Sequence, residues 1–277
     1  MRISLLAATV ACGSLWTMNA HAVRYWSGEC GEIYDACGPS SLPSGCDTVD
    51  TAFGALGNVG WTNQFLFAGP SAWPQDWMEA SISGFDNIWM DKSNAAMAIW
   101  SGHGTSGPSE PDGAWALSFS DPHNGVCHAW APSQIKFGER NGTGWANDSN
   151  NEFLIVDASC SMILGEVETV WENWGPGIMM GGQQVMAFMN SPEDRGDRVV
   201  EFADNVLYGD SNVSAWLDAG ETCYAFWCFD SPIVLTHGSN QANANQRHAN
   251  TSIWGSQFSA PGWGGWYLAS WIDNGSC

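Results

Sequence analysis

One histidine and one cysteine each follow a short apolar run, and together they could form a thiol–imidazole pair. His103 comes three residues after the run Ala95–Trp100, and Cys160 comes four residues after the run Phe153–Val156. A thiol is a strong nucleophile only when it is ionised, and a nearby imidazole can take its proton. The pair therefore indicates nucleophilic catalysis, provided that the fold brings both side chains to one place.

The elements that must position this pair alternate along the chain. Short apolar runs predict buried strands at Ala95–Trp100, Phe153–Val156, Gln184–Met189 and Pro232–Thr236, and a further apolar run, Phe65–Ala68, lies in a Trp-rich irregular stretch. Apolar residues at helical spacing lie between them, at Val49, Ala52, Phe53 and Leu56, at Val167, Val170, Trp171 and Trp174, and at Val199, Phe202, Ala203 and Val206. This alternation predicts an α/β fold: a three-layer α/β/α sandwich with a mostly parallel sheet.

Residues just past the carboxyl ends of parallel strands are candidates for catalysis or binding, because ligands bind at that edge of the sheet. Gly102 and Gly104 flank His103 and permit a sharp turn with close approach of the backbone. The amide N–H groups near Gly104 and of Cys160 could form an oxyanion hole. Asp157 and Ser159 lie close enough in sequence to support the pair. A helix beginning near residue 164 would point its positive N-terminus at a thiolate.

The two segments resemble the catalytic motifs of the caspase-like (clan CD) cysteine peptidases. The sequence has Gly-His-Gly-Thr at 102–105 and, 160 − 103 = 57 residues after the histidine, Asp-Ala-Ser-Cys ending at Cys160. The form found in gingipains and clostripain is the most similar. The resemblance implies a caspase-like fold and a cysteine endopeptidase, with His103 as the catalytic imidazole and Cys160 as the nucleophile. Ser159 stands where the family usually has alanine, and no Ser-Gly pair follows the cysteine.

Composition excludes several classes of function. The 277 residues carry 8 Lys and Arg against 29 Asp and Glu, a formal net charge of −21. Such a chain cannot neutralise many phosphates, so nucleic acid is not an expected partner. No segment reaches the roughly 18 uninterrupted apolar residues that a membrane span needs. We expect a globular monomer whose partner is a peptide or protein substrate.

The N-terminal segment has the features of a secretory signal peptide. Arg2 provides a positive charge, residues 5–10 are apolar, and Ala20-His21-Ala22 is an A-x-A cleavage site. We expect residues 1–22 to be removed and the protein to be exported, as a secreted or periplasmic protein. Residues 23–277 are then expected to form a single domain, with a loop-rich insertion at about 105–150 that could hold a hairpin.

Eight cysteines remain after the predicted cleavage, and export permits disulfide bonds. Cys223 and Cys228 have the spacing of a structural pair. Cys160 has three interpretations from sequence: the nucleophile, a disulfide partner, or a buried thiol. If Cys160 is free, at least one other cysteine stays unpaired, and Cys127 and Cys277 are the expected candidates because they lie in irregular segments.

Three other groups of residues could form a functional site instead of this pair. His237-Gly238 also follows an apolar run, and we expect His237 to make a structural hydrogen bond instead. His123, Cys127 and His128 match none of the usual zinc spacings. Asp112, Asp121 and Asp148 could hold Ca²⁺, although no twelve-residue calcium loop is present. No metal or other cofactor is therefore predicted.

The 18 tryptophans suggest an alternative function on the same scaffold. Trp254, Trp263, Trp266 and Trp271 lie near the C-terminus, and indoles stack well on apolar faces of ligands. They could instead cover the sheet and fill loops. The alternative is a catalytically inactive Trp-rich protein that binds a carbohydrate or a protein surface.

Overall fold

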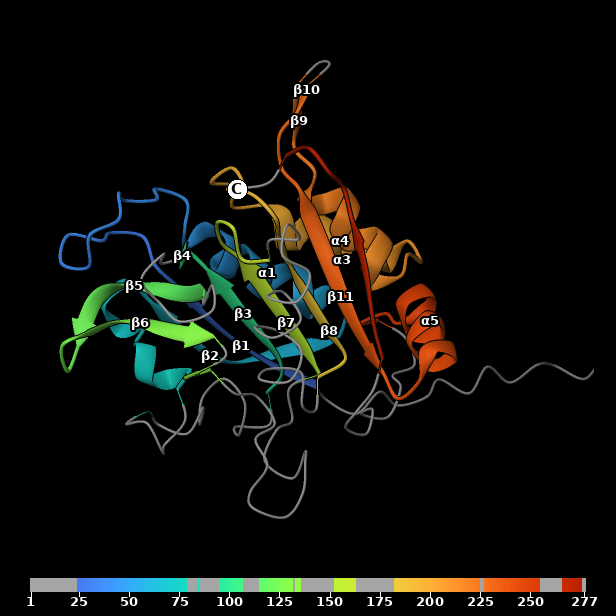
Figure 1. Ribbon diagram of the computed structural model, residues 1–277, viewed down its shortest axis with the longest axis horizontal. Helices are drawn as coiled ribbons and strands as arrows, with labels where there is room; N and C mark the ends of the chain where they lie inside the picture. Colours follow the sequence, from blue (N-terminus) through green and yellow to red (C-terminus); the bar gives the residue numbers. More distant parts are fainter. Residues whose placement is uncertain are drawn as a thin grey trace, which may run out of the picture.

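The computed structural model describes residues 24–78, 84, 95–106, 115–131, 133–135, 152–162, 182–224, 227–254 and 266–275. In these residues the chain is a mixed α/β protein built on one large, mostly parallel sheet (Figure 1). The predicted fold class is therefore confirmed. The predicted signal peptide and the helix predicted from about residue 164 lie outside the described residues.

Seven strands make up the large sheet. Their bounds are β1 (Arg24–Cys30), β2 (Trp61–Ala68), β3 (Ala95–Ser101), β7 (Phe153–Asp157), β8 (Gln184–Phe188), β11 (Pro232–Gly238) and β12 (Trp266–Trp271). They lie in the order β12-β11-β8-β7-β3-β1-β2. Strands β1, β2, β3, β7 and β8 are mutually parallel, whereas β11 runs antiparallel to both β8 and β12. The four predicted strands are β3, β7, β8 and β11, and the apolar run Phe65–Ala68 lies in β2. Strands β1 and β12 were not predicted.

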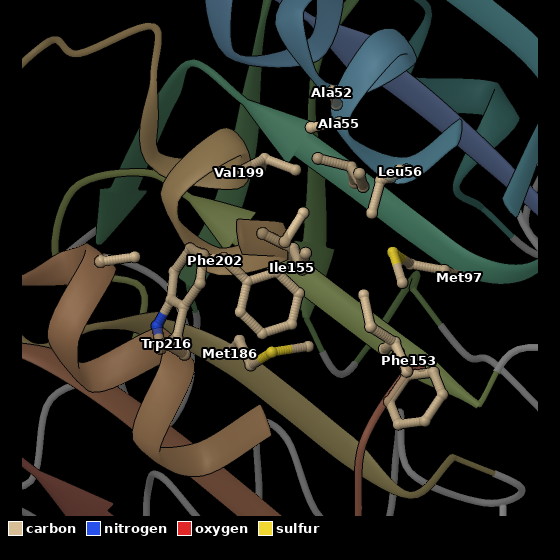
Figure 2. Close-up of a cluster of buried hydrophobic side chains, with 14 of the residues drawn as sticks. Ala52, Ala55, Leu56, Met97, Phe153, Ile155, Met186, Val199, Phe202 and Trp216 are labelled. Carbon is tan, nitrogen blue, oxygen red and sulfur yellow. The ribbon is translucent and has the colours of Figure 1, made fainter. Parts of the chain in front are cut away.

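Helices cover one face of this sheet. They are α1 (Asp47–Asn58), α3 (Arg198–Leu207), α4 (Asn212–Gly220) and α5 (Gln241–Asn250). Figure 2 shows side chains of α1, α3 and α4 meeting those of the central strands in one apolar cluster. Its labelled members include Leu56, Ile155 and Phe202, each fully buried. The predicted face of α3 is confirmed, but Phe53 of α1 is 62% exposed, because the helix buries only a narrow stripe.

A smaller antiparallel sheet covers part of the other face. It consists of β4 (His103–Ser106), β5 (Trp115–His123) and β6 (Val126–Ala131), in the order β4-β5-β6. Together with 3-10 turns at Gly69–Ser71 and Pro74–Asp76, it buries a second apolar cluster that contains Trp77, Trp100 and Phe119. Much of the segment predicted as a loop-rich insertion is thus regular structure, because its alternate residues pack on the large sheet.

Three disulfide bonds join described cysteines: Cys30–Cys46, Cys37–Cys127 and Cys223–Cys228. The last closes a two-stranded hairpin of β9 (Cys223–Tyr224) and β10 (Trp227–Cys228). The expectation that Cys127 could be unpaired is wrong, since it ties β6 to a loop 90 residues earlier. Disulfides of this number fit an oxidising compartment. None of the described helices is both long and apolar enough to cross a membrane.

Candidate active site

Adjacent strands deliver His103 and Cys160 to one edge of the large sheet. β3 and β7 are parallel neighbours in register, with Ser101 opposite Asp157 at their carboxyl ends (Figure 1). The Gly102 N–H continues this alignment by donating a hydrogen bond to the Asp157 carbonyl at 3.1 Å. His103 comes two residues after Ser101, and Cys160 comes three residues after Asp157. The register thus places both residues just past the carboxyl ends of neighbouring strands.

The His103 ring is held by two residues that the sequence analysis did not identify. Its Nε2 lies 2.6 Å from the backbone carbonyl oxygen of Ser40. A carbonyl only accepts hydrogen bonds, so Nε2 carries the proton and Nδ1 is left as the basic nitrogen. The ring also packs edge-on against Tyr34. The Tyr34 hydroxyl accepts a hydrogen bond from the backbone N–H of His103 at 2.9 Å. In a catalytic triad the third member orients the imidazole, and the Ser40 carbonyl has the geometry for that role.

The sequence could not have indicated Ser40 or Tyr34. Both lie in a turn-rich segment more than 60 residues before His103, without periodicity or a recognisable motif. Ser40 acts through its backbone carbonyl, so even its residue type carries no signal. Burial raises the pKa of Tyr34 well above its ordinary value, and its hydroxyl therefore stays protonated near the histidine.

Both glycines around His103 are required by close approach. Gly102 has a φ of +154°, and a Cβ there would meet the Tyr34 hydroxyl at 2.5 Å. A Cβ on Gly104 would lie 2.2 Å from the Trp115 ring and 2.6 Å from the carbonyl oxygen of Ser159. The indole N–H of Trp115 donates to that same carbonyl at 3.1 Å. The small sheet is thus hydrogen-bonded to the segment that carries Cys160, and position 104 has room only for glycine.

Cys160 stands in an unusual backbone conformation. Its φ is +51°, in the left-handed region that residues with a Cβ seldom adopt. Strain of this kind costs on the order of 1–3 kcal/mol and gathers at functional sites. The turn leaves Cys160 half-buried, with Sγ 3.9 Å from the Ser191 hydroxyl.

The Cys160 sulfur is disulfide-bonded in this structure. The other six described cysteines are paired with one another, so its partner is outside the described residues. A sulfur in a disulfide cannot act as a nucleophile. The structure therefore represents the oxidised state of the site, and any thiol chemistry at Cys160 needs reduction first.

Two backbone amides at the site, those of Cys160 and Gly102, already have acceptors. The Cys160 N–H donates to the Asn190 carbonyl at 2.9 Å, and the Gly102 N–H donates to the Asp157 carbonyl. The prediction that the Cys160 amide binds the oxyanion therefore does not fit this state. Gly104, which packs against the Ser159 carbonyl, stays the candidate.

Asp157 supports the site, but through the sheet edge and not through the histidine. Its carboxylate, which is buried, binds the Arg198 guanidinium at 2.7 Å and accepts a hydrogen bond from the Thr48 hydroxyl at 3.2 Å. Arg198 also binds the buried Asp230 at 2.9 Å. We call Asp157, Arg198 and Asp230 the carboxylate network. Burial raises the pKa of Asp157, and the adjacent Arg198 opposes that shift.

A small pocket of about 30 Å³ opens beside the pair. Its walls come from both sides of the site and include Gly102, Ala158 and Ser159 together with Glu193 and Asp194; Leu42, Gly45, Ser101, Asp157, Pro192, Arg195 and Arg198 complete it. The volume admits about one water molecule. Neither His103 nor Cys160 is among its lining residues, which instead include their neighbours Gly102 and Ser159.

His237 lies at the opposite edge of the sheet. β11 runs antiparallel to β8, so its carboxyl end meets the amino end of β8, where the His237 N–H donates to the Gln183 carbonyl at 2.9 Å. The ring stacks on Tyr267. His237 therefore cannot serve as the base for Cys160.

The residues considered as metal ligands in the sequence make other contacts in the structure. His123 stacks on Trp73 with ring centroids 3.9 Å apart, Cys127 is in a disulfide, and His128 Nδ1 lies 3.2 Å from the Ser118 hydroxyl. Of the carboxylates proposed for Ca²⁺, Asp112 and Asp148 lie outside the described residues. Among the described residues, a possible ligand cluster occurs at Glu221, Cys223 and Cys228, but its sulfurs are bonded to each other.

Three of the four C-terminal tryptophans are described, and all are exposed. Trp254, Trp266 and Trp271 are each about half exposed to solvent, at 45%, 53% and 47%. About half of each side chain is therefore in contact with protein, which leaves both interpretations, ligand binding and packing over the sheet and loops, open. Trp263 lies outside the described residues.

Comparisons with known proteins identify a family without assigning an activity. The sequence model of a family described as a domain of unknown function (DUF6345) matches residues 32–271. No curated protein matches the chain. A solved structure described as "structure of pro-sf-caspase-1" is similar at 11% identity with a TM-score of 0.38, covering 79% of this chain and 85% of its own.

Proposed function

The chain belongs to the DUF6345 family, and we propose that it is a latent cysteine peptidase that hydrolyses peptide bonds with Cys160 and His103. One observation carries the proposal. Neighbouring parallel strands in register present an oriented imidazole and a cysteine at the same sheet edge. Rigid strand ends are well suited to hold two reacting groups in a fixed geometry.

The reaction starts from the reduced thiol. His103 Nδ1 takes the Cys160 proton, and the thiolate attacks the substrate carbonyl to give a tetrahedral oxyanion. Collapse of this intermediate breaks the C–N bond, and the imidazolium returns its proton to the leaving amine. Water, deprotonated by His103, then hydrolyses the thiol ester, which releases the carboxylic acid and restores the thiol. The Ser40 carbonyl stabilises the imidazolium in both halves.

The oxyanion requires donors on the side of β4. The Gly104 amide is the first donor in this proposal, because no side chain stands between the backbone and a bound carbonyl there. The Cys160 amide becomes a second donor only if it leaves the Asn190 carbonyl. Reduction of the disulfide would free the left-handed turn at Cys160 to make this adjustment.

The test is hydrolysis of a peptide library by the mature protein after mild reduction. We expect turnover in the reduced wild type and its loss in Cys160→Ala. The matched control is Cys223→Ala/Cys228→Ala, which also removes one disulfide but leaves the site intact. Equal turnover in the wild type and Cys160→Ala would overturn the proposal.

The binding function predicted from the tryptophans is a second candidate, and two observations favour it. Cys160 is oxidised, and three C-terminal indoles are exposed. In that case the Cys160 disulfide is a structural bond and the site is inactive. Titration with soluble oligosaccharides, followed by tryptophan fluorescence, separates the candidates: quenching that is lost in Trp266→Ala and persists in Cys160→Ala supports the binder.

A further inference from the structure

We propose that the β9–β10 hairpin and the acidic hollow at its base form a docking surface for a segment of another protein that is rich in lysine and arginine. The proposal goes beyond peptide hydrolysis and does not depend on it, because docking uses neither Cys160 nor His103.

Three aromatic side chains in and next to the hairpin are exposed to solvent. Tyr224, Trp227 and Phe229 are 57%, 73% and 49% exposed. Tyr224 and Trp227 lie opposite each other in the hairpin, so their side chains share one face. The hairpin projects from the body of the protein (Figure 1). Large aromatic side chains that gather at an exposed surface are typical of interaction sites.

The hairpin is held in place by a covalent bond and a polar contact. A two-stranded hairpin is only marginally stable by itself. Here the Cys223–Cys228 disulfide closes its base, and the Tyr224 hydroxyl donates a hydrogen bond to the Glu193 carboxylate at 2.8 Å. The aromatic rings therefore stand on a fixed platform, which reduces the conformational entropy that binding costs.

An acidic hollow of about 830 Å³ opens at the base of the hairpin, and Cys223 and Tyr224 form part of its wall. Its charged lining residues are Asp47, Arg195, Asp197, Glu201, Asp218 and Glu221. Five carboxylates against one guanidinium leave 5 − 1 = 4 net negative charges. A cationic ligand is therefore attracted to the hollow.

The one cation of the hollow is already occupied by two of these carboxylates. Arg195 Nε lies 2.8 Å from Asp197 Oδ1, and its Nη2 lies 2.8 Å from Glu201 Oε2. The other three carboxylates, which form no ion pair within the described part of the chain, are Asp47, Asp218 and Glu221. These three carboxylates are left for the cations of a ligand.

The spread of the carboxylates indicates several cationic groups and not one metal ion. Among the described residues, the cluster of three ligand-type groups within 4.8 Å of one another contains Glu221 and the two sulfurs of the hairpin disulfide. Asp47 and Asp218 are not part of it. Lysine and arginine side chains bind separate carboxylates and also lie over the faces of indole and phenol rings. A basic segment of chain therefore suits both halves of the docking surface.

The overall charge of the chain argues against two other occupants of the docking surface. The formal net charge is −21, so a second copy of this chain would be repelled. The headgroups of an anionic membrane would be repelled for the same reason. The occupant that fits is a basic segment of a different protein.

The docking surface adjoins the proposed active site. Glu193, which accepts the hydrogen bond from Tyr224, and Arg195, which lines the hollow, both also line the small pocket beside the catalytic pair. A docked partner would thus lie near His103 and Cys160. Docking itself needs no thiol, so it can be measured while Cys160 is oxidised.

The docking surface is tested by titrating the unreduced mature protein with fluorescein-labelled octa-arginine, followed by fluorescence anisotropy. We expect saturable binding, and a Kd that rises steeply as NaCl is raised from about 10 mM to about 1 M, because the Debye length falls from roughly 30 Å to 3 Å. Labelled octa-glutamate should not bind. No binding of octa-arginine at low salt would overturn the proposal.

The acidic hollow is tested with Asp47→Asn/Asp218→Asn/Glu221→Gln. The Kd for octa-arginine should rise about ten-fold, because three solvent-accessible ion pairs with the peptide are lost. Glutamine at 221 keeps an oxygen that can accept the hydrogen bond from the Asn274 side chain, which Glu221 accepts at 3.1 Å.

The matched control removes three carboxylates that do not line the hollow, Asp35→Asn/Asp204→Asn/Asp210→Asn. It changes the net charge equally, and its Kd should stay within about two-fold of the wild type. An equal rise of the Kd in both triple variants would show that net charge alone attracts the peptide, and would overturn the docking surface.

The hairpin is tested with Tyr224→Ala/Trp227→Ala, which should raise the Kd about five-fold because the ring faces no longer contact the cations. The control, Phe53→Ala/Tyr208→Ala, removes two exposed aromatic side chains elsewhere and should bind like the wild type. An unchanged Kd in the hairpin variant would overturn its role. Sedimentation with phosphatidylcholine vesicles is a further measurement: wild-type binding that the hairpin variant loses would assign the hairpin to a lipid surface and overturn the protein partner.

The docking proposal and the peptidase proposal fail separately. If Cys160→Ala binds octa-arginine like the wild type while reduced wild type hydrolyses no peptide, docking stands and the peptidase is refuted. If reduced wild type hydrolyses peptides and the hollow and hairpin variants bind octa-arginine like the wild type, the peptidase stands and the docking surface is refuted.

Discussion

The two edges of the large sheet are held by different chemistry. At the carboxyl edge, Arg198 lies buried between Asp157 and Asp230. At the amino edge, Gln184 donates to the Thr236 hydroxyl at 3.1 Å, accepts from Asn212 at 2.9 Å, and Thr236 lies 2.8 Å from His248 Nδ1. We call Gln184, Thr236, Asn212 and His248 the amide–hydroxyl network.

The difference coincides with the place of the proposed site, which lies at the carboxyl edge. Charges are expensive to bury, and a buried ion pair is often no more stabilising than apolar packing, whereas neutral hydrogen bonds cost less to satisfy. The buried charges lie at the edge where the proposed site is, and the neutral hydrogen bonds lie at the opposite edge. The His-Gly dipeptide occurs at both edges, and only the copy at the charged edge has an oriented ring beside a cysteine.

The largest expected effect separates the two histidines. In reduced protein, His103→Ala should lower turnover by about 10²–10⁴-fold, which is the usual contribution of a general base. His237→Gln should retain wild-type turnover per folded molecule, because it lies at the other edge. Initial rates on a peptide substrate, normalised by near-ultraviolet circular dichroism, give the comparison. Comparable losses in both variants would mean that the edges do not differ in function.

The next effect compares the two networks in stability. Arg198→Met leaves Asp157 and Asp230 buried without their cation and should lower the free energy of unfolding by about 3–5 kcal/mol. Thr236→Val deprives the Gln184 amide of its acceptor and should cost about 1–3 kcal/mol. Urea unfolding without reductant measures both. A larger loss of unfolding free energy in Thr236→Val than in Arg198→Met would contradict the expectation that the carboxylate network is the more costly one to disrupt.

The smallest effect is a pH dependence at the charged edge. The buried carboxyl of Glu29, on β1, lies against that of Asp76 and accepts a hydrogen bond from the Trp77 indole at 2.7 Å. Burial raises the pKa of Glu29 well above 4.5 and that of Asp76 above 3.8. The native state therefore holds more protons than the unfolded state once pH exceeds these ordinary values. The stability that the pair contributes is complete below them and is lost as pH rises through the raised pKa values.

Glu29→Gln should flatten that slope, which is about 1.4 kcal/mol per pH unit for each extra proton. The amide–hydroxyl network works in the opposite direction: burial lowers the pKa of His248, so its contribution is lost as pH falls below 6.5. Unfolding free energies between pH 4 and 8 test both. An unchanged slope in Glu29→Gln would show that the Glu29–Asp76 pair does not titrate in this range.

Much of the fold could be predicted from the sequence because buried parallel strands are continuous apolar runs. Ala95–Trp100 and Phe153–Val156 are strands β3 and β7 for this reason. Strand β12 was not predicted because its side chains are only partly buried. Strand β1 was not predicted because Ser27 and Glu29, which are fully buried, interrupt its apolar pattern. The small sheet was predicted only as a segment that could hold a hairpin, because its strands lie in a stretch rich in glycine, serine and proline, although Trp115, Leu117 and Phe119 alternate in β5.

The candidate site was predictable only in part. His103, Cys160 and the flanking glycines follow recognisable strands, so their types and positions could be identified. The Ser40 carbonyl, the Tyr34 ring and the Arg198 cation act across 41 to 69 residues of sequence, and no local pattern connects them to the site. The oxidised state of Cys160 was one of three interpretations that sequence left open.

The sequence by itself determined which segments are buried strands and which residues follow them, because burial and periodicity are local properties of the chain. Only the tertiary structure decided the direction of β11, and with it which His-Gly dipeptide lies beside Cys160. It also decided that the cysteine is held in a disulfide and that a backbone carbonyl orients the histidine. These outcomes depend on which distant segments meet when the sheet closes, and pairing between distant segments leaves no periodic signal in the chain.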